Sequence, residues 1–148
     1  MPSIWNDADR ADLVRRAWTV TPGHTAKWGK FNATGMLAHL SDSLRMALGE
    51  LSVPGGRAPA ILKWAPVRYL VIHKLPMPKS APTAPELIAR CSTADLEQEQ
   101  QALQSLFDAL PRHAQLAATH PAFGAMTRDD WGALIHKHTD HHLRQFGV

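Results

Sequence analysis

The sequence contains a single cysteine, Cys91, among its 148 residues. One cysteine cannot form an internal disulfide bond, and the N-terminus lacks the charged, apolar and small-residue pattern of a secretory leader. We therefore expect the protein to work in a reducing cytoplasm.

The sequence also lacks a long hydrophobic run. Its most apolar stretch, ILKWAPVRYLVIHKL at 61–75, contains Lys63, Pro66 and Arg68, and it is shorter than the ~20 residues that a membrane span needs. We expect this stretch to lie in the protein core, and we expect no membrane partner.

Clustered charge of one sign is absent as well. The formal net charge is +3, but the sixteen Lys and Arg residues are scattered, and no run of five or more occurs. Nucleic-acid-binding proteins usually gather basic residues in a stripe interleaved with aromatic residues. The charge pattern therefore argues against a DNA or RNA partner.

What the chain does have is apolar material for one core. Hydrophobic residues make up 45% of the sequence, which includes five tryptophans. Chains of about 100–200 residues usually build a single core. We expect residues 1–148 to form a single domain.

Helical spacing of apolar residues predicts five segments. The expected helices cover 6–18, 33–49, 60–73 with a kink near Pro66, 95–110 with Ser92 or Thr93 as the N-cap, and 127–146. The last of these begins with Thr127 and Asp130 at the spacing of a capping signal.

No stretch shows a convincing strand pattern. The segment LPMPKSAPTAP at 75–85 contains four prolines, which exclude regular helix and favour an extended surface connection. Four long helices joined through this crossover predict an all-α fold, a four-helix bundle with short extra helices in its connections.

Four histidines lie close together in the last predicted helix, at positions 136, 138, 141 and 142. On a helical wheel, His138 and His142 share the face of Trp131, Leu134, Ile135 and Phe146. His141 falls at the edge of that face, and His136 falls on the opposite side. The wheel thus selects His138 and His142 as the inward pair.

Residues four apart on a helix can bind one divalent cation together. The alternative is a pair of core histidines that are hydrogen-bonded to neighbours. His39 lies within an amphipathic helix between Leu37 and Leu40, so it could meet the pair across the core. Three imidazoles would leave at least one coordination position open, which is typical of a catalytic ion, with Zn²⁺, Ni²⁺ and Fe²⁺ all compatible.

Four more residues are candidates for lining or supporting the site, each with a structural alternative. His120 is expected at the mouth of the site or in packing, and His141 as an outer donor, an alternate ligand or neither. Asp42 could orient a ligand or be a solvated or capping residue. Gln145 could touch a ligand or satisfy a buried backbone group.

Two stretches of the chain resemble a known family. WGKFNATGMLAHLSDSLRMALG at 28–49 and HPAFGAMTRDDWGALIHKHTDHHLRQFGV at 120–148 are similar to an uncharacterised family of the DinB-like superfamily of bacterial metal-binding proteins. This resemblance implies up-down-down-up connectivity and a homodimer. It also implies a divalent metal held by three histidines, which fall on His39, His138 and His142.

Better-characterised members of that superfamily are thiol-dependent S-transferases or isomerases. The resemblance thus implies a metal-dependent enzyme that acts on a small-molecule substrate with a low-molecular-weight thiol, or a hydrolase. Peptidase chemistry of the H-E-x-x-H type is disfavoured, because Asp140 faces away from the histidine pair. The alternatives are a non-catalytic or stress-associated metal-binding bundle, and a metal-free bundle whose histidines respond to pH.

Overall fold

The computed structural model describes all residues, 1–148, and it is mostly helical. The five α-helices are α1 (Asp7–Thr19), α2 (Ala33–Ala47), α3 (Ala65–His73), α4 (Leu96–Ala109) and α5 (Arg128–Gln145). Short 3-10 helices lie at Ala60–Lys63 (η1), Pro85–Leu87 (η2) and Leu110–Arg112 (η3), and β1 (Thr119–His120) pairs with β2 (Gly124–Ala125). The all-α prediction is confirmed, apart from this tiny hairpin.

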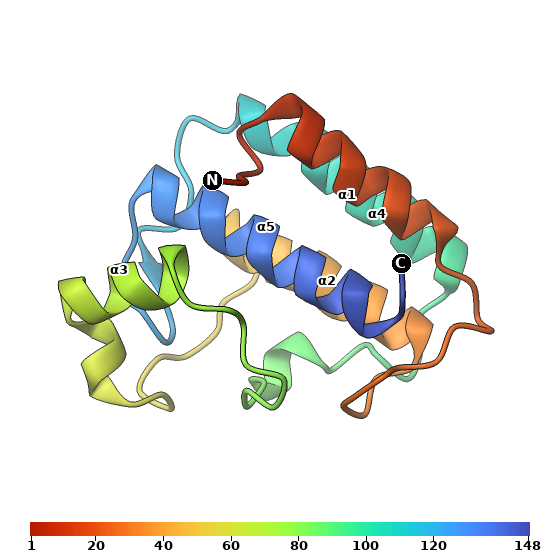
Figure 1. Ribbon diagram of the computed structural model, residues 1–148, viewed down its shortest axis with the longest axis horizontal. Helices are drawn as coiled ribbons and strands as arrows, with labels where there is room; N and C mark the ends of the chain where they lie inside the picture. The colour runs from red at the N-terminus through yellow and green to blue at the C-terminus, as the bar shows by residue number, and fades with distance from the viewer.

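Four helices form the bundle. In Figure 1, α1 and α5 run in one direction, while α2 and α4 run in the other, which is up-down-down-up connectivity. Helix α2 packs against α4 and α5, and α1 packs against the same two helices. The core between them includes the fully buried Met36, Leu40, Phe107 and Leu143.

The ends of the helices follow local capping chemistry. Thr127 accepts a hydrogen bond from the backbone N–H of Asp130, whose carboxylate accepts one from Thr127 in return. This capping box confirms the predicted start of α5. The predicted cap of α4 was wrong, because Asp95 caps that helix and Thr93 instead bonds to the Arg90 carbonyl.

The segment at 60–73 forms two helices, not one kinked helix. Trp64 is extended between η1 and α3. Pro66 lies in the first turn of α3, where a missing backbone N–H leaves no hydrogen bond unmade. The proline therefore starts a helix here, and the expected kink does not exist.

The expectation that residues 61–75 form a core segment was also wrong. Ile72 is the buried residue of α3, and it packs in the core next to α5. Trp64, Tyr69 and Leu70 are exposed instead. No helix of the protein combines the length and hydropathy that crossing a bilayer requires.

Candidate metal centre

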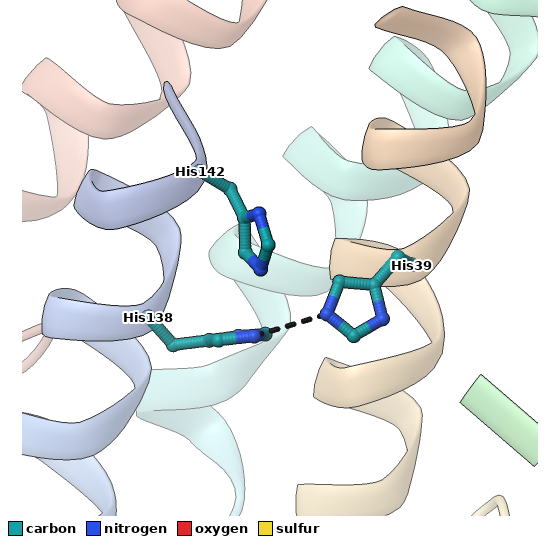
Figure 2. A group of neighbouring side chains, drawn as sticks. All are labelled: His39, His138 and His142. Atoms are coloured by element: carbon teal, nitrogen blue, oxygen red, sulfur yellow. Dashed lines mark hydrogen bonds between the residues drawn. The ribbon is translucent and has the colours of Figure 1, made fainter. Parts of the chain in front are cut away.

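Three histidine side chains from two antiparallel helices converge inside the bundle. His39 comes from the middle of α2, and His138 and His142 come from adjacent turns of α5, as Figure 2 shows. Their potential ligand atoms all lie within 4.8 Å of one another. The Nε2 atoms of His39 and His138 are 3.0 Å apart.

The cluster is shielded from water. His39 is 3% exposed, and His138 and His142 are partly buried. The ring of Phe31 stacks on His39 with a centroid distance of 5.0 Å and meets His142 edge-on at 5.7 Å. Phe31 therefore covers one side of the histidine cluster.

Hydrogen bonds to the outer nitrogens of His39 and His142 determine which ring nitrogen of each is unprotonated. His39 Nδ1 lies 3.0 Å from the carbonyl oxygen of Leu87. A carbonyl only accepts, so Nδ1 carries the proton, and the Nε2 lone pair of His39 faces the cluster.

His142 is oriented in the same way through a side-chain amide. Its Nδ1 lies 2.7 Å from Gln145 Oε1, and the amide nitrogen of Gln145 donates to the Trp28 carbonyl at 2.5 Å. Because the amide nitrogen is committed to a carbonyl, Oε1 must accept from His142 Nδ1–H. The Nε2 of His142 is then also unprotonated, so its lone pair can bind a metal ion. Gln145 is the hydrogen-bond partner that orients the ring.

Burial keeps these imidazoles neutral. Desolvation lowers the pKa of His39, and it lowers the pKa of His142 to about 3, with a further contribution from His39. The pKa of His138 lies well below its usual value, first because of burial and then because of its two histidine neighbours. Neutral imidazole is the form that binds a metal.

The donor set fits a divalent ion. With metal–nitrogen bonds of about 2.1 Å, two donors on one ion are separated by roughly 3.0 Å at right angles and 3.4 Å at a tetrahedral angle. The observed 3.0 Å between His39 and His138 lies at the start of this range. Small side-chain shifts would therefore allow the three residues to coordinate one ion.

His120 and His141 lie outside this set. His120 sits in β1, where its Nδ1 accepts the N–H of Ala122 and its ring packs against Phe123 and Trp131. Burial lowers the pKa of His120 to about 4. His141 is next to His142, with ring centroids 5.2 Å apart.

Asp42 has neither of its two expected roles. Its side chain is buried, and it pairs with Arg90 at 2.9 Å and Arg45 at 2.8 Å. Arg90 also binds Glu99 of α4. Asp42 therefore belongs to an ionic connection between α2 and α4, while Asp140 pairs with Arg16 and Arg144.

Gln145 was a candidate from the sequence, but the other supporting contacts of the cluster were not predicted. These contacts are the carbonyls of Leu87 and Trp28 and the ring of Phe31. All three lie between the α-helices, where no periodic pattern of apolar residues indicates how the chain crosses the bundle. Two surface cavities lie away from the cluster, one of about 410 Å³ between α1 and α4 and one of about 350 Å³ near Leu116 and Trp131.

The family described as "Protein of unknown function (DUF1569)" matches residues 8–147, nearly the whole sequence. The chain belongs to the DUF1569 family. No curated protein and no solved structure matches it. For this DUF1569 protein, the established features are thus a helical bundle and a buried three-histidine cluster that could hold a metal ion.

Proposed function

We propose that this protein binds one divalent metal ion through the Nε2 atoms of His39, His138 and His142. The observation that carries the proposal is the convergence of three neutral imidazoles, two of which, His39 and His142, have their outer nitrogens committed to hydrogen bonds. Leu87 and Gln145 accept from the Nδ1–H groups of His39 and His142, so the Nε2 lone pairs of both histidines are left for the cluster, where His39 Nε2 meets His138 Nε2. Such outer hydrogen bonds are characteristic of metal-binding histidines.

We further propose that the protein is a metal-dependent enzyme of the DinB-like superfamily. An ion held by three histidines has room for a further ligand. A thiol or water molecule bound there would have a lowered pKa, which makes it a nucleophile at neutral pH. The resemblance of 28–49 and 120–148 to that superfamily favours a thiol-dependent S-transferase over a hydrolase. The partners would be a small-molecule substrate and a low-molecular-weight thiol.

The surroundings of the cluster support a small ligand. The indole N–H of Trp28 is buried without a hydrogen-bond partner, and the Trp28 ring lies 5.4 Å from His141, the neighbour of His142. A buried donor without a partner is unfavourable unless a ligand or water accepts from it. We assign Trp28 to the wall of the substrate site on this ground.

Three imidazoles do not select one ion among Zn²⁺, Ni²⁺ and Fe²⁺, because geometry and supply decide between these metals.

The homodimer implied by the resemblance remains part of the proposal. Light scattering during size-exclusion chromatography would measure it directly.

One observation favours a second function, non-catalytic metal binding. Phe31 stacks on His39 and touches His142 edge-on, so an aromatic ring occupies one approach to the ion. A closed coordination shell would make the ion a structural or storage ion.

Cobalt substitution distinguishes the two functions. Co²⁺ bound to three imidazoles has visible absorption bands that report its coordination. Addition of a small thiol should give a new sulfur-to-metal charge-transfer band if a position is open. Bound Co²⁺ whose spectrum does not respond to thiols would contradict the enzyme proposal and support the non-catalytic one.

A further inference from the structure

Exposed hydrophobic side chains are concentrated in one short part of the chain. Eight large hydrophobic residues are strongly exposed, and five of them fall within 61–75. They are Ile61 (56%), Trp64 (61%), Tyr69 (54%), Leu70 (46%) and Leu75 (45%). A concentration of this kind marks an interaction surface more often than scattered single residues do.

The segment that carries these residues is firmly attached. Figure 1 shows η1 and α3 at one edge of the molecule, projecting from the layer of bundle helices. His73 bonds to Asp130 at 2.8 Å, and Lys137 donates to the Leu75 carbonyl at 2.9 Å. The exposed residues therefore belong to a well-anchored unit, not to a loose connection.

The same part of the chain is free of acidic residues. No Asp or Glu occurs between Glu50 and Glu86, whereas this stretch has five Lys and Arg residues. Arg57 pairs with Glu86, and Arg68 lies 3.9 Å from Asp130. Lys63 and Lys74 take part in none of the ion pairs of the protein, and Lys74 lies 5.8 Å from the Tyr69 ring.

We propose that this unit docks the protein onto an anionic lipid bilayer. We use the name α3 surface for the exposed hydrophobic residues of this unit, Ile61, Trp64, Tyr69, Leu70 and Leu75, together with the exposed Lys63 and Lys74. Trp and Tyr favour the boundary between lipid and water, and lysines are attracted to anionic headgroups. This docking is peripheral, and it replaces the expectation that the protein has no membrane partner.

The observations favour a bilayer over other occupants. A second copy related by a twofold axis would place Lys63 and Lys74 against a surface of the same charge. The two cavities reported above are lined by residues outside the α3 surface, and this surface belongs to a unit that projects from the bundle. A deformable bilayer can accept such a surface.

The test is co-sedimentation of the full chain with lipid vesicles. Vesicles of phosphatidylcholine alone are compared with vesicles that also contain phosphatidylserine, at low and at high salt. We expect binding to the anionic vesicles at low salt and a strong loss at high salt, because salt screens the attraction of lysines to headgroups. Tryptophan fluorescence of the chain should also shift to shorter wavelengths on binding, because the exposed Trp64 leaves water.

Two variants separate the charged and apolar contributions. Lys63→Gln/Lys74→Gln should lower the partition coefficient roughly 25-fold, since each lysine near an anionic leaflet contributes about fivefold. Trp64→Ser/Leu70→Ser should lower it by at least about tenfold through lost apolar burial. Trp18→Ser and Lys30→Gln, which change exposed residues outside the surface, should leave binding unchanged.

Several results would overturn the proposal. These are no binding to anionic vesicles at low salt, equal binding to both vesicle types, and variants that bind like the unmodified protein. A dimer abolished by Trp64→Ser/Leu70→Ser would identify the α3 surface as an interface between copies. Binding to an acidic polypeptide in place of vesicles would identify an acidic protein as the partner. Circular dichroism of each variant confirms that it is folded.

Discussion

His39 Nε2 lies 3.0 Å from His138 Nε2, although the two residues are 99 positions apart in the chain. His39 Nδ1 carries the proton that it donates to the Leu87 carbonyl, so His39 Nε2 has a lone pair and can only accept. In the metal-free protein, His138 Nε2–H must therefore be the donor of the hydrogen bond between the two rings. For both nitrogens to bind one ion, the His138 proton would have to move from Nε2 to Nδ1 of the same ring. The shared hydrogen bond thus holds two ligand atoms together before any metal arrives.

Gln145→Met should weaken metal binding. The substitution removes the group that accepts from His142 Nδ1–H and also donates to Trp28. Loss of such an orienting partner lowers metal affinity by about 10–100-fold. Isothermal titration calorimetry with zinc measures the affinity.

The matched control for that variant is Gln100→Met. Gln100 is also buried, but it donates to the carbonyls of Ala17, Trp18 and Val20, away from the histidines. It should lose stability, about 1–3 kcal/mol for the unsatisfied carbonyls, and retain zinc affinity. Equal loss of zinc affinity in both variants would show that Gln145 has no specific role.

Gly29→Ala should disturb the same support. Gly29 has φ of +79°, and an added Cβ would lie 2.6 Å from the Gln145 amide nitrogen. Gly49 has the same φ with nothing within 4 Å. Gly49→Ala should therefore lose only the roughly 1–2 kcal/mol of a left-handed residue, while Gly29→Ala should lose more and also bind zinc less tightly. Urea unfolding and zinc titration of both variants measure the difference, and identical behaviour would contradict the account.

The stability of the metal-free protein should fall as pH decreases. Burial lowers the pKa values of His39, His138 and His142 below the unfolded value of about 6.5. The unfolded chain then binds more protons below that pH, so the stabilisation is complete above about pH 6.5 and is lost as pH falls.

Each such histidine contributes a slope of at most about 1.4 kcal/mol per pH unit. Urea unfolding of chelator-treated protein from about pH 7.5 to 5 measures the slope. Stability that stays constant over this interval would mean that the histidines are not held neutral in the fold.

Arg90→Gln should destabilise the fold without affecting the metal. Arg90 bridges the buried carboxylates of Asp42 and Glu99, and its loss leaves both without their main partner. Breaking a buried pair costs about 3–5 kcal/mol, and we expect about 2–4 because the Arg90 side chain is 41% exposed. Arg57→Gln, which removes a surface pair with Glu86, should change stability little. Reduced zinc affinity in Arg90→Gln would show that Asp42 acts on the cluster after all.

The helix periodicity predicted the bundle and the inward side of α5, because Trp131, Leu134 and Ile135 define a face that extends to His138 and His142. Periodicity says nothing about the partners that come from connections. The Leu87 carbonyl reaches His39 from 48 residues away, and Arg90 reaches Asp42 over the same separation.

Composition failed at 61–75 for a different reason. An apolar run indicates low affinity for water, but it does not specify which of its residues pack in the core of the protein and which stay on its surface. In this protein, Ile72 meets the core, whereas Trp64 and Tyr69 remain exposed. The error is informative, because it locates the surface that we assign to lipid docking.

The most direct test of the central claim is the metal content of tag-free protein purified without chelator, beside a His138→Ala/His142→Ala variant. We predict about one divalent ion per unmodified chain, as expected for a single site of three histidines, and none in the variant. A folded, metal-free protein that also fails to bind added zinc, nickel or iron would contradict the account.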